Sequence, residues 1–331
     1  MQNKKKDVLY CGVDKDKIKK AEPVMNATSL ELFVHWIEER YKVHIKKDVK
    51  HDPQPWTNDR IIENYRFTNV RREQDRQTKY LIDNIVNNNK LTLEEKIVNC
   101  TMFRYWNLWD TMKLLGGPWG KKEIIDQSAH RQALVKYTHI IAENPRHGFF
   151  TKAFFTSGAK MGVRAYFDEP NMVLGVFNLA KYMYENDIPK KCLECQTQYD
   201  VFMIFKCLPG IANFLGYQIF VDLTYIPEFP FSENEFTIAG PGCKKGLKRL
   251  IVNPDGLNPE ECVFWLRDNI EKIAPQFKPM NFMTDLPEEE RHLTVMSLEN
   301  CLCEFSKYIR AVNKEGRPKQ KYIPYKEKDN D

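Results

Sequence analysis

The 331 residues carry 50 Lys and Arg against 45 Asp and Glu, a net charge of +5, and 42% of them are hydrophobic. This length and apolar content suffice for one large core or two modest ones, and the mild positive charge permits an acidic partner without requiring one. No run of ~18 uncharged apolar residues exists, so we expect no membrane span. The first residues lack the apolar segment of a secretory signal, which predicts an intracellular protein, in the host cytoplasm for a viral gene or the nucleus for a eukaryotic one.

Helical periodicity dominates the chain, starting with an amphipathic helix over residues 29–43. A second helix is expected over 69–88, and a capping box at residues 92–95 opens a third that runs to Leu115. Further helices are predicted near residues 121–137, 171–186, 197–207, 212–225, 259–273 and 292–313. RAYF (164–167) and EFTIA (235–239) are short strand candidates.

No internal repeat or clear boundary divides the chain. The sequence therefore predicts an N-terminal extension over 1–27, a single mainly α domain over 28–313, and a flexible charged tail over 314–331.

The nine cysteines form no regular framework, which argues against disulfides. Cys192 and Cys195 have the CxxC spacing of zinc ligands, but no second ligand pair follows. We predict ordinary reduced thiols, no metal and no cofactor.

The stretch CLPGIANFLGYQI (207–219) has the pattern of two helices joined by a tight turn. Gly210 allows a positive φ, and the N–H groups that open the following helix can bind a DNA phosphate without reading sequence. The candidate DNA contacts are Leu208, Gly210, Ala212 and Asn213. An ordinary corner between two helices is the alternative.

The stretch GPGCKKG (240–246) opens another helix with a glycine-rich, lysine-bearing turn. Gly240, Gly242, Lys244 and Lys245 resemble a phosphate cradle. A helix start with a basic outer face explains the pattern equally well. The spacing is not that of a Walker A loop, which these 331 residues lack throughout.

A third polar stretch runs from Tyr65 to Tyr80. On the expected helix, Arg72, Arg76 and Lys79 share one face, with Asp75 beside them. Arginine forks suit a phosphate leaving group, whereas a solvated face with ion pairs is the simpler alternative.

Three strings in this order, NYRFTNVRREQDRQTKYL, CLPGIANFLGYQI and FTIAGPGCKKGL, resemble the phage α-glutamyl/putrescinyl-thymine pyrophosphorylases. That family is also described as amino acid:DNA transferases, and its helical module is attached to 5-hydroxymethyluracil DNA kinases. The resemblance covers about residues 60 to 310. It implies a helix-hairpin-helix fold like that of DNA glycosylases.

The resemblance also implies a reaction. A kinase pyrophosphorylates 5-hydroxymethyluracil in duplex DNA, and the transferase displaces the pyrophosphate with an amino acid or a polyamine. The partners are then DNA with a modified thymine, a small amine donor and a 5-hydroxymethyluracil DNA kinase. The target base has to be flipped out of the duplex.

Carried over by motif, the resemblance implies two groups of site residues. The polar pocket is Arg66, Asn69, Arg72, Asp75 and Arg76, and phosphate is held by Gly240, Gly242, Lys244 and Lys245. Where glycosylases of this fold have a catalytic Asp, this chain offers Glu233 or Glu235. Asp222 lies too early for that role and is expected to cap a helix or pair with a cation.

Two other functions remain open at this stage. One is a glycosylase that excises an altered base, which the hairpin supports and the missing Asp weakens. The other is a non-catalytic DNA-binding module that serves a separate kinase.

Overall fold

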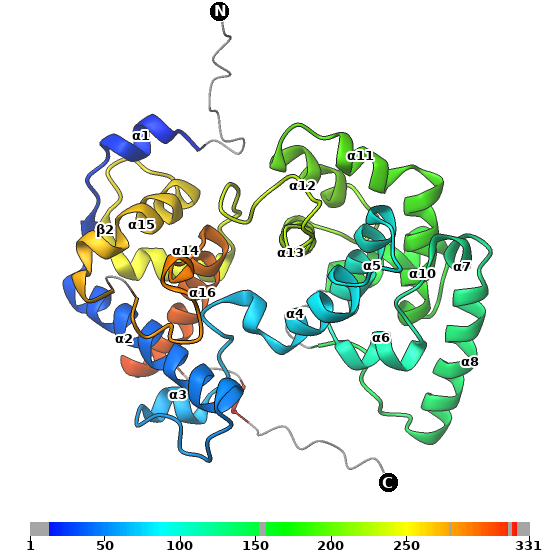
Figure 1. The fold of residues 1–331 in the computed structure, drawn as a ribbon, viewed down its shortest axis with the longest axis horizontal. Coiled ribbons are helices and arrows are strands. Elements are labelled where there is room, and N and C mark those ends of the chain that lie inside the picture. The colour runs from blue at the N-terminus through cyan, green and yellow to red at the C-terminus, as the bar shows by residue number, and fades with distance from the viewer. Residues whose placement is uncertain (1–12, 152–156, 278–279, 317–319, 323–331) are drawn as a thin grey trace, which may run out of the picture. The chain divides into compact units, whose positions relative to one another are not determined.

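The computed structural model describes residues 13–151, 157–277, 280–316 and 320–322, with the side chains of 157–161 left out. The chain is mainly helical, as predicted (Figure 1). It divides into two compact units, Met1–Gln74 with Ala239–Asp331 (unit 1) and Asp75–Ile238 (unit 2). The predicted domain over 28–313 thus contains parts of both units.

Unit 1 joins the two ends of the described chain around helices that share an apolar core. Phe33 and Phe305 meet edge to face in this core, with ring centroids 5.0 Å apart. The elements of unit 1 are α1 (Lys15–Lys20), β1 (Val24–Met25), α2 (Ala27–His44), π-helical η1 (Ile45–Val49), α3 (Arg60–Asn64), 3₁₀-helical η2 (Arg72–Gln74), α14 (Pro241–Leu250), β2 (Ile251–Asn253), α15 (Pro259–Ile273), η4 (Pro275–Phe277), η5 (Glu288–Glu290) and α16 (Val295–Val312).

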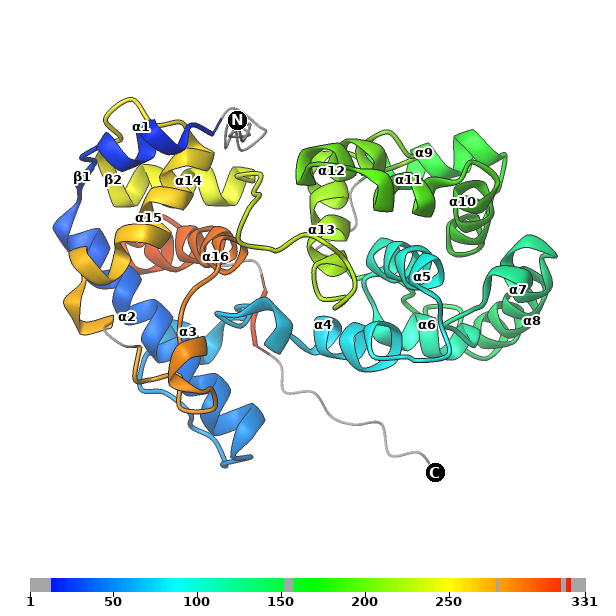
Figure 2. The same ribbon diagram turned by 45° about the horizontal axis from the view of Figure 1, so that its top comes forward.

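Two helices of unit 1, α14 and α16, lie side by side in both views (Figure 1 and Figure 2). The short strands β1 and β2 pair antiparallel, with Val24 opposite Asn253. This pairing joins the segment before α2 to the end of α14. It therefore ties part of the predicted N-terminal extension into unit 1.

Unit 2 is a bundle of helices. Its elements are α4 (Arg76–Leu81), π-helical η3 (Ile82–Val86), α5 (Leu93–Trp106), α6 (Trp109–Leu115), α7 (Lys121–Ile125), α8 (Ser128–Glu143), α9 (Ser157–Phe167), α10 (Met172–Glu185), α11 (Ile188–Glu194), α12 (Gln198–Lys206) and α13 (Asn213–Leu223).

A buried ion pair joins α5 to α13 in unit 2. The Arg104 guanidinium donates to both carboxylate oxygens of Asp222, at 2.5 and 2.6 Å, and also to Asn107 Oδ1 at 2.6 Å. Asp222 is fully buried, so its charge needs this partner. The prediction that Asp222 pairs with a cation is confirmed.

Several predicted elements differ from the structure for local reasons. The helix expected over 69–88 is a loop, the short η2, then α4 and η3. The helix expected over 92–115 breaks at Asn107, which has a left-handed φ of 49°. The one expected over 121–137 breaks at Gln127, with φ 61°.

Both strand candidates are wrong. Residues 164–167 lie in α9, and no strand forms over 235–239. Alternation of apolar and polar residues over four or five positions is too short to distinguish strand from helix or loop.

The predicted flexible tail lies mostly outside the described residues. Within it, Lys321 forms a β-bridge with Tyr65, and the Arg66 N–H donates to the Gln320 carbonyl at 3.0 Å. None of the described helices combines the length and apolar character that crossing a membrane requires.

Candidate functional site

The loop before η2 is held by buried polar contacts from two helices. The Arg40 guanidinium, on α2, donates to Asn69 Oδ1, and the Asn69 amide donates to the Gln74 carbonyl at 2.7 Å. From α16, Asn300 Nδ2 donates to the Asn69 carbonyl at 3.2 Å. Asn69 is only 5% exposed, so its side chain fixes the loop that carries Arg71 and Arg72.

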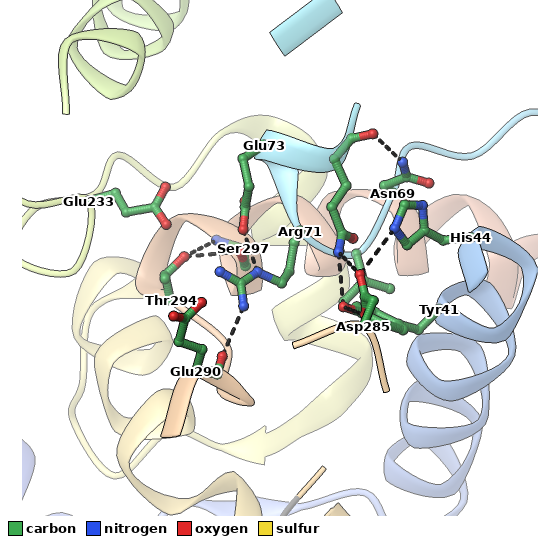
Figure 3. Close-up of polar contacts among 12 residues, drawn as sticks. Tyr41, His44, Asn69, Arg71, Glu73, Glu233, Asp285, Glu290, Thr294 and Ser297 are labelled. Carbon is green, nitrogen blue, oxygen red and sulfur yellow. Dashed lines mark hydrogen bonds and ion pairs between the residues drawn. The ribbon is translucent and has the colours of Figure 1, made fainter. Parts of the chain in front are cut away.

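A second network holds the end of η2 (Figure 3). Gln74 Nε2 donates to the Tyr41 hydroxyl at 2.9 Å, and Tyr41 in turn donates to Asp285 Oδ1 at 2.7 Å. His44 Nε2 lies 3.5 Å from the other Asp285 oxygen. Burial and the hydrogen bond to Asp285 raise the pKa of Tyr41 above its ordinary value, so the hydroxyl stays protonated and acts as a donor.

Arg71 and Arg72 follow each other in sequence but have different surroundings. Arg71 pairs with Glu73 and donates to the Glu290 carbonyl at 2.9 Å, as Figure 3 shows. Arg72 is 4% exposed, and its charge acts on the carboxylate of Glu299, on α16. Of the two, Arg72 is therefore the one that lies near the start of α14.

Glu299 is a buried carboxylate, 7% exposed, that accepts a hydrogen bond from the Gly240 N–H at 3.1 Å. Burial raises the pKa of Glu299 to about 7, and the nearby carboxylates of Glu260 and Glu304 act in the same direction. The Gly240 N–H and the Arg72 charge oppose this rise. Near neutral pH the group therefore exists in both protonation states.

The backbone that opens α14 donates to a second carboxylate as well. The Ala239 N–H donates to Glu260 Oε1, on α15, at 3.0 Å. Helix N-termini attract negative charge, and here side chains of the protein supply it. The Gly240 N–H of the predicted phosphate cradle thus donates to Glu299 in this structure, and phosphate binding at Gly240 stays a prediction.

The glycines of this turn have a packing role. A Cβ at Gly242 would lie 2.2 Å from Cys303 Sγ, and one at Gly246 would lie 2.2 Å from the Leu302 carbonyl oxygen. Both positions therefore have to be glycine for α14 to pack closely on α16. This close approach explains the lack of a side chain at Gly242 by packing, and phosphate binding there stays a prediction.

The lysines of the turn point away from this packing. Lys244 and Lys245 are exposed, and so are Lys248 and Arg249 on the same helix. Arg249 pairs with Glu315. The outer side of α14 is therefore a basic surface, which we call the α14 basic face and define by Lys244, Lys245, Lys248 and Arg249.

Arg66 lies toward the C-terminal half of α16. It is exposed, and its charge acts on Lys307, which pairs with Glu304. Burial opposes the charged form of Lys307, but the Glu304 charge and hydrogen bond dominate and raise its pKa. Arg66, Arg72 and the start of α14 thus all lie along α16 in unit 1.

Asp75 and Arg76, the last two residues of the predicted pocket, belong to unit 2. Asp75 is the N-cap residue of α4, and the Arg76 guanidinium lies over the Trp109 ring, 4.8 Å from its centroid. Because η2 and α4 are separate elements, Arg72, Arg76 and Lys79 do not share a helix face, and that expectation is wrong.

The acidic candidates near residue 234, Glu233 and Glu235, belong to unit 2, and Glu233 is half-buried. Glu235 is exposed and accepts a hydrogen bond from Gln198, and Glu233 accepts one from the Tyr225 hydroxyl at 3.2 Å. Neither contact resembles the buried surroundings of Glu299.

The predicted turn between two helices is confirmed at residues 207–212. α12 ends at Lys206, α13 begins at Asn213, and Gly210 has φ 74°. Leu208 and Ile211 are buried, whereas Ala212 and Asn213 are exposed. The exposed start of α13 is compatible with a backbone contact, and DNA binding there stays a prediction.

The acidic groups around α14 were missed by sequence reasoning. Glu299 and Glu304 stand among apolar residues in MSLENCLCEF (296–305), and a charge on the buried face of an amphipathic helix is the signal that marks them. Glu260 lies in the first turn of α15, where acidic residues are common, so its sequence position does not mark it as part of a site.

Comparison with known proteins shows which family the chain belongs to. The family model described as the helical domain of 5-hmdU DNA kinase matches residues 27–317. The chain belongs to the family of 5-hmdU DNA kinase helical domains. The matched range includes parts of both units and every described site residue named above.

A 5-hmdU DNA kinase of Bacillus phage SP10 is 22% identical over 325 residues, which cover 92% of this chain and 48% of that protein. The chain thus spans about half the length of this curated relative. No solved structure was found to match the chain.

Proposed function

We propose that this chain modifies 5-hydroxymethyluracil in DNA by replacing a pyrophosphate group on the base with an amine. Membership in the 5-hmdU DNA kinase helical-domain family supports the substrate class. The observation that carries the proposal is that Arg72, Glu299 and the start of α14 meet along one side of α16. Cationic groups beside an acid–base group are what displacement of pyrophosphate by an amine requires.

The reaction forms one bond and breaks one. The neutral amine nitrogen attacks the methylene carbon attached to C5 of the base, a C–N bond forms, and the C–O bond to pyrophosphate breaks. The pyrophosphate leaves with the electron pair of that bond. Negative charge develops on its oxygens, and the proposal assigns their stabilisation to Arg66 and Arg72.

DNA has to present the base to these groups. The α14 basic face provides exposed positive charge for the phosphate backbone, and the turn at residues 207–212 provides a second backbone contact. Flipping a base out of the stack costs a few kcal/mol, and such phosphate contacts offset that cost.

The proposed reaction differs from that of a kinase. No Walker A pattern occurs in these 331 residues, and the proposed step needs no nucleotide. A 5-hydroxymethyluracil DNA kinase is then the partner that supplies the pyrophosphorylated base. The amine donor is an amino acid or a polyamine.

The test is pyrophosphate release. Duplex DNA with pyrophosphorylated 5-hydroxymethyluracil is incubated with the chain and a panel of amino acids and polyamines. We expect stoichiometric pyrophosphate with at least one amine and none without it. Absence of release with the whole panel contradicts the proposal, and abasic sites in the product indicate a glycosylase instead.

A non-catalytic role is the second candidate, because the chain spans only 48% of a relative named as a kinase. In that case the chain binds DNA for a separate kinase. The same reaction mixture, supplemented with such a kinase and 5-hydroxymethyluracil DNA, distinguishes the two. Faster phosphorylation without any amine-dependent pyrophosphate release favours the accessory role.

A further inference from the structure

Of the buried carboxylates in the described part of unit 1, Glu299 is held where two segments of the proposed site meet. One of its oxygens is fixed by the Gly240 N–H at 3.1 Å, at the first residue before α14. The positive charge of Arg72, in η2, acts on it and favours its ionised form. The Gly240 hydrogen bond orients the carboxylate toward the start of α14.

The proposed reaction also requires a group that removes a proton from the amine, and no residue has yet been assigned to that role. Amino acids and polyamines are mostly protonated at neutral pH, since ordinary amines have pKa values of about 8 to 10.4. An ammonium nitrogen has no lone pair with which to attack carbon. A group that removes its proton inside the site is therefore needed, and such a group works best when its pKa is near the working pH.

We propose that Glu299 is this general base, a role that rests on the proposed transferase function. The ionised carboxylate takes one proton from the ammonium and leaves a neutral amine. That amine attacks the methylene carbon, and pyrophosphate departs with the electron pair of the C–O bond. The neutral Glu299 carboxyl then passes its proton to the departing pyrophosphate or to water, which restores the carboxylate for the next cycle.

The groups that face Glu299 from each packed element set its proton affinity. They are Arg72 from η2, Glu260 from α15, Glu304 and Cys303 from α16, and the Gly240 N–H and Cys243 from α14. Burial and the two carboxylates favour the neutral acid, whereas Arg72 and the N–H favour the carboxylate. The balance gives a pKa of about 7, at which one group both takes and returns a proton readily.

Neighbouring carboxylates are less suited to the role. Glu304 is paired with Lys307, and Glu260 is more exposed and accepts the Ala239 N–H. Both act on Glu299 through their charge.

The experiment compares two amines of different basicity. The first is the amine that gives the fastest pyrophosphate release with the wild-type protein. The second is its analogue with two fluorine atoms on the carbon β to the nitrogen, which lower the amine pKa so that a large share of it is neutral at pH 7. A general base is needed for the first amine only. We expect Glu299→Gln to lower turnover of the ordinary amine by about 100-fold or more at saturating DNA, and turnover of the fluorinated amine by less than about fivefold.

Three further measurements complete the design. Glu299→Asp, which keeps a carboxylate, is expected to recover part of the activity, and Glu31→Gln, an exposed glutamate on α2, to change neither rate. Circular dichroism checks that each variant is folded. The wild-type rate with the ordinary amine is expected to rise with pH through about 7, and the Glu299→Gln rate to lack that step.

The outcomes separate the two proposals. Equal losses with both amines, or no loss with either, overturn the role of Glu299 while the transferase function stands. No pyrophosphate release by the wild-type protein with any amine overturns the transferase function itself, and the role of Glu299 falls with it.

Discussion

The Glu299 carboxylate accepts a hydrogen bond from the Gly240 N–H at 3.1 Å, so a side chain of α16 occupies the start of α14. This contact joins two stretches that are 59 residues apart in sequence. It also places an acid between the loop that carries Arg72 and the turn that carries Lys244 and Lys245. Predictions about stability, DNA binding and chemistry follow from this arrangement and from the packing around it.

The first prediction concerns stability against pH. Because the pKa of Glu299 is raised from 4.5 to about 7, the native state binds its proton more tightly than the unfolded state does. The associated stability is complete below the unfolded pKa and is lost as pH rises through about 7. Glu299→Gln, which cannot ionise, is expected to match the wild type near pH 4 and to be more stable by about 3 kcal/mol above pH 8.

Urea denaturation at a series of pH values measures this difference. Glu31→Gln serves as the control, since that side chain is exposed. A stability difference between Glu299→Gln and the wild type that stays constant from pH 4 to pH 9 contradicts a raised pKa at Glu299.

The second prediction concerns the buried ion pair of unit 2. Asp222→Asn leaves the Arg104 guanidinium buried without its counter-charge, and we expect a loss of about 3–5 kcal/mol in the free energy of unfolding. Asp187→Asn is the matched control, because Asp187 is exposed and Asn tolerates its positive φ of 52°. A loss below about 1 kcal/mol for Asp222→Asn, measured by the same denaturation, argues that the pair is not formed.

The third prediction concerns the contact between α14 and α16. A methyl group at position 246 would lie 2.2 Å from a backbone oxygen, which cannot move aside as a side-chain tip does. Gly246→Ala is therefore expected to lower the melting temperature by several degrees, corresponding to about 1–3 kcal/mol of overpacking. Gly148→Ala has no atom within 4 Å of the new methyl group and should change the melting temperature little. Equal melting temperatures for the two variants would contradict the close contact between α14 and α16.

The fourth prediction concerns the α14 basic face. If Lys244 and Lys245 each neutralise one phosphate, replacing both with Gln should weaken DNA binding for any sequence and reduce the slope of log affinity against log salt by about 2. The control pair is Lys122→Gln with Lys272→Gln, two exposed lysines away from α14. Fluorescence anisotropy with a labelled duplex at several salt concentrations gives both slopes. If the slope of log affinity against log salt is unchanged in the Lys244 and Lys245 variant, the α14 basic face does not contact DNA.

Local patterns were sufficient to predict most helices and the turn at Gly210. Thr92 and Glu95 form the predicted capping box, with the Glu95 carboxylate accepting the Thr92 N–H at 2.8 Å. Such signals involve residues three or four apart, so the sequence displays them directly. The mainly helical class and the α12–α13 turn followed from them.

Contacts between distant segments were beyond the same reasoning. The interruption of the 69–88 helix depends on Arg40 and Asn300, which bind Asn69 from two other helices. The role of Gly242 depends on Cys303, which faces it across the helix contact. Neither partner is signalled by the residues around the motif, so tertiary contacts overrode local propensity at both places.

The most direct measurement of the central claim is mass spectrometry of nucleosides after reaction. DNA with pyrophosphorylated 5-hydroxymethyluracil is incubated with the chain and the active amine, digested to nucleosides and analysed. The account predicts a thymidine analogue whose mass equals that of thymidine plus the amine less two hydrogens, together with an equal amount of pyrophosphate. Recovery of only the starting nucleoside, its hydrolysis product 5-hydroxymethyldeoxyuridine or abasic sugar would contradict the account.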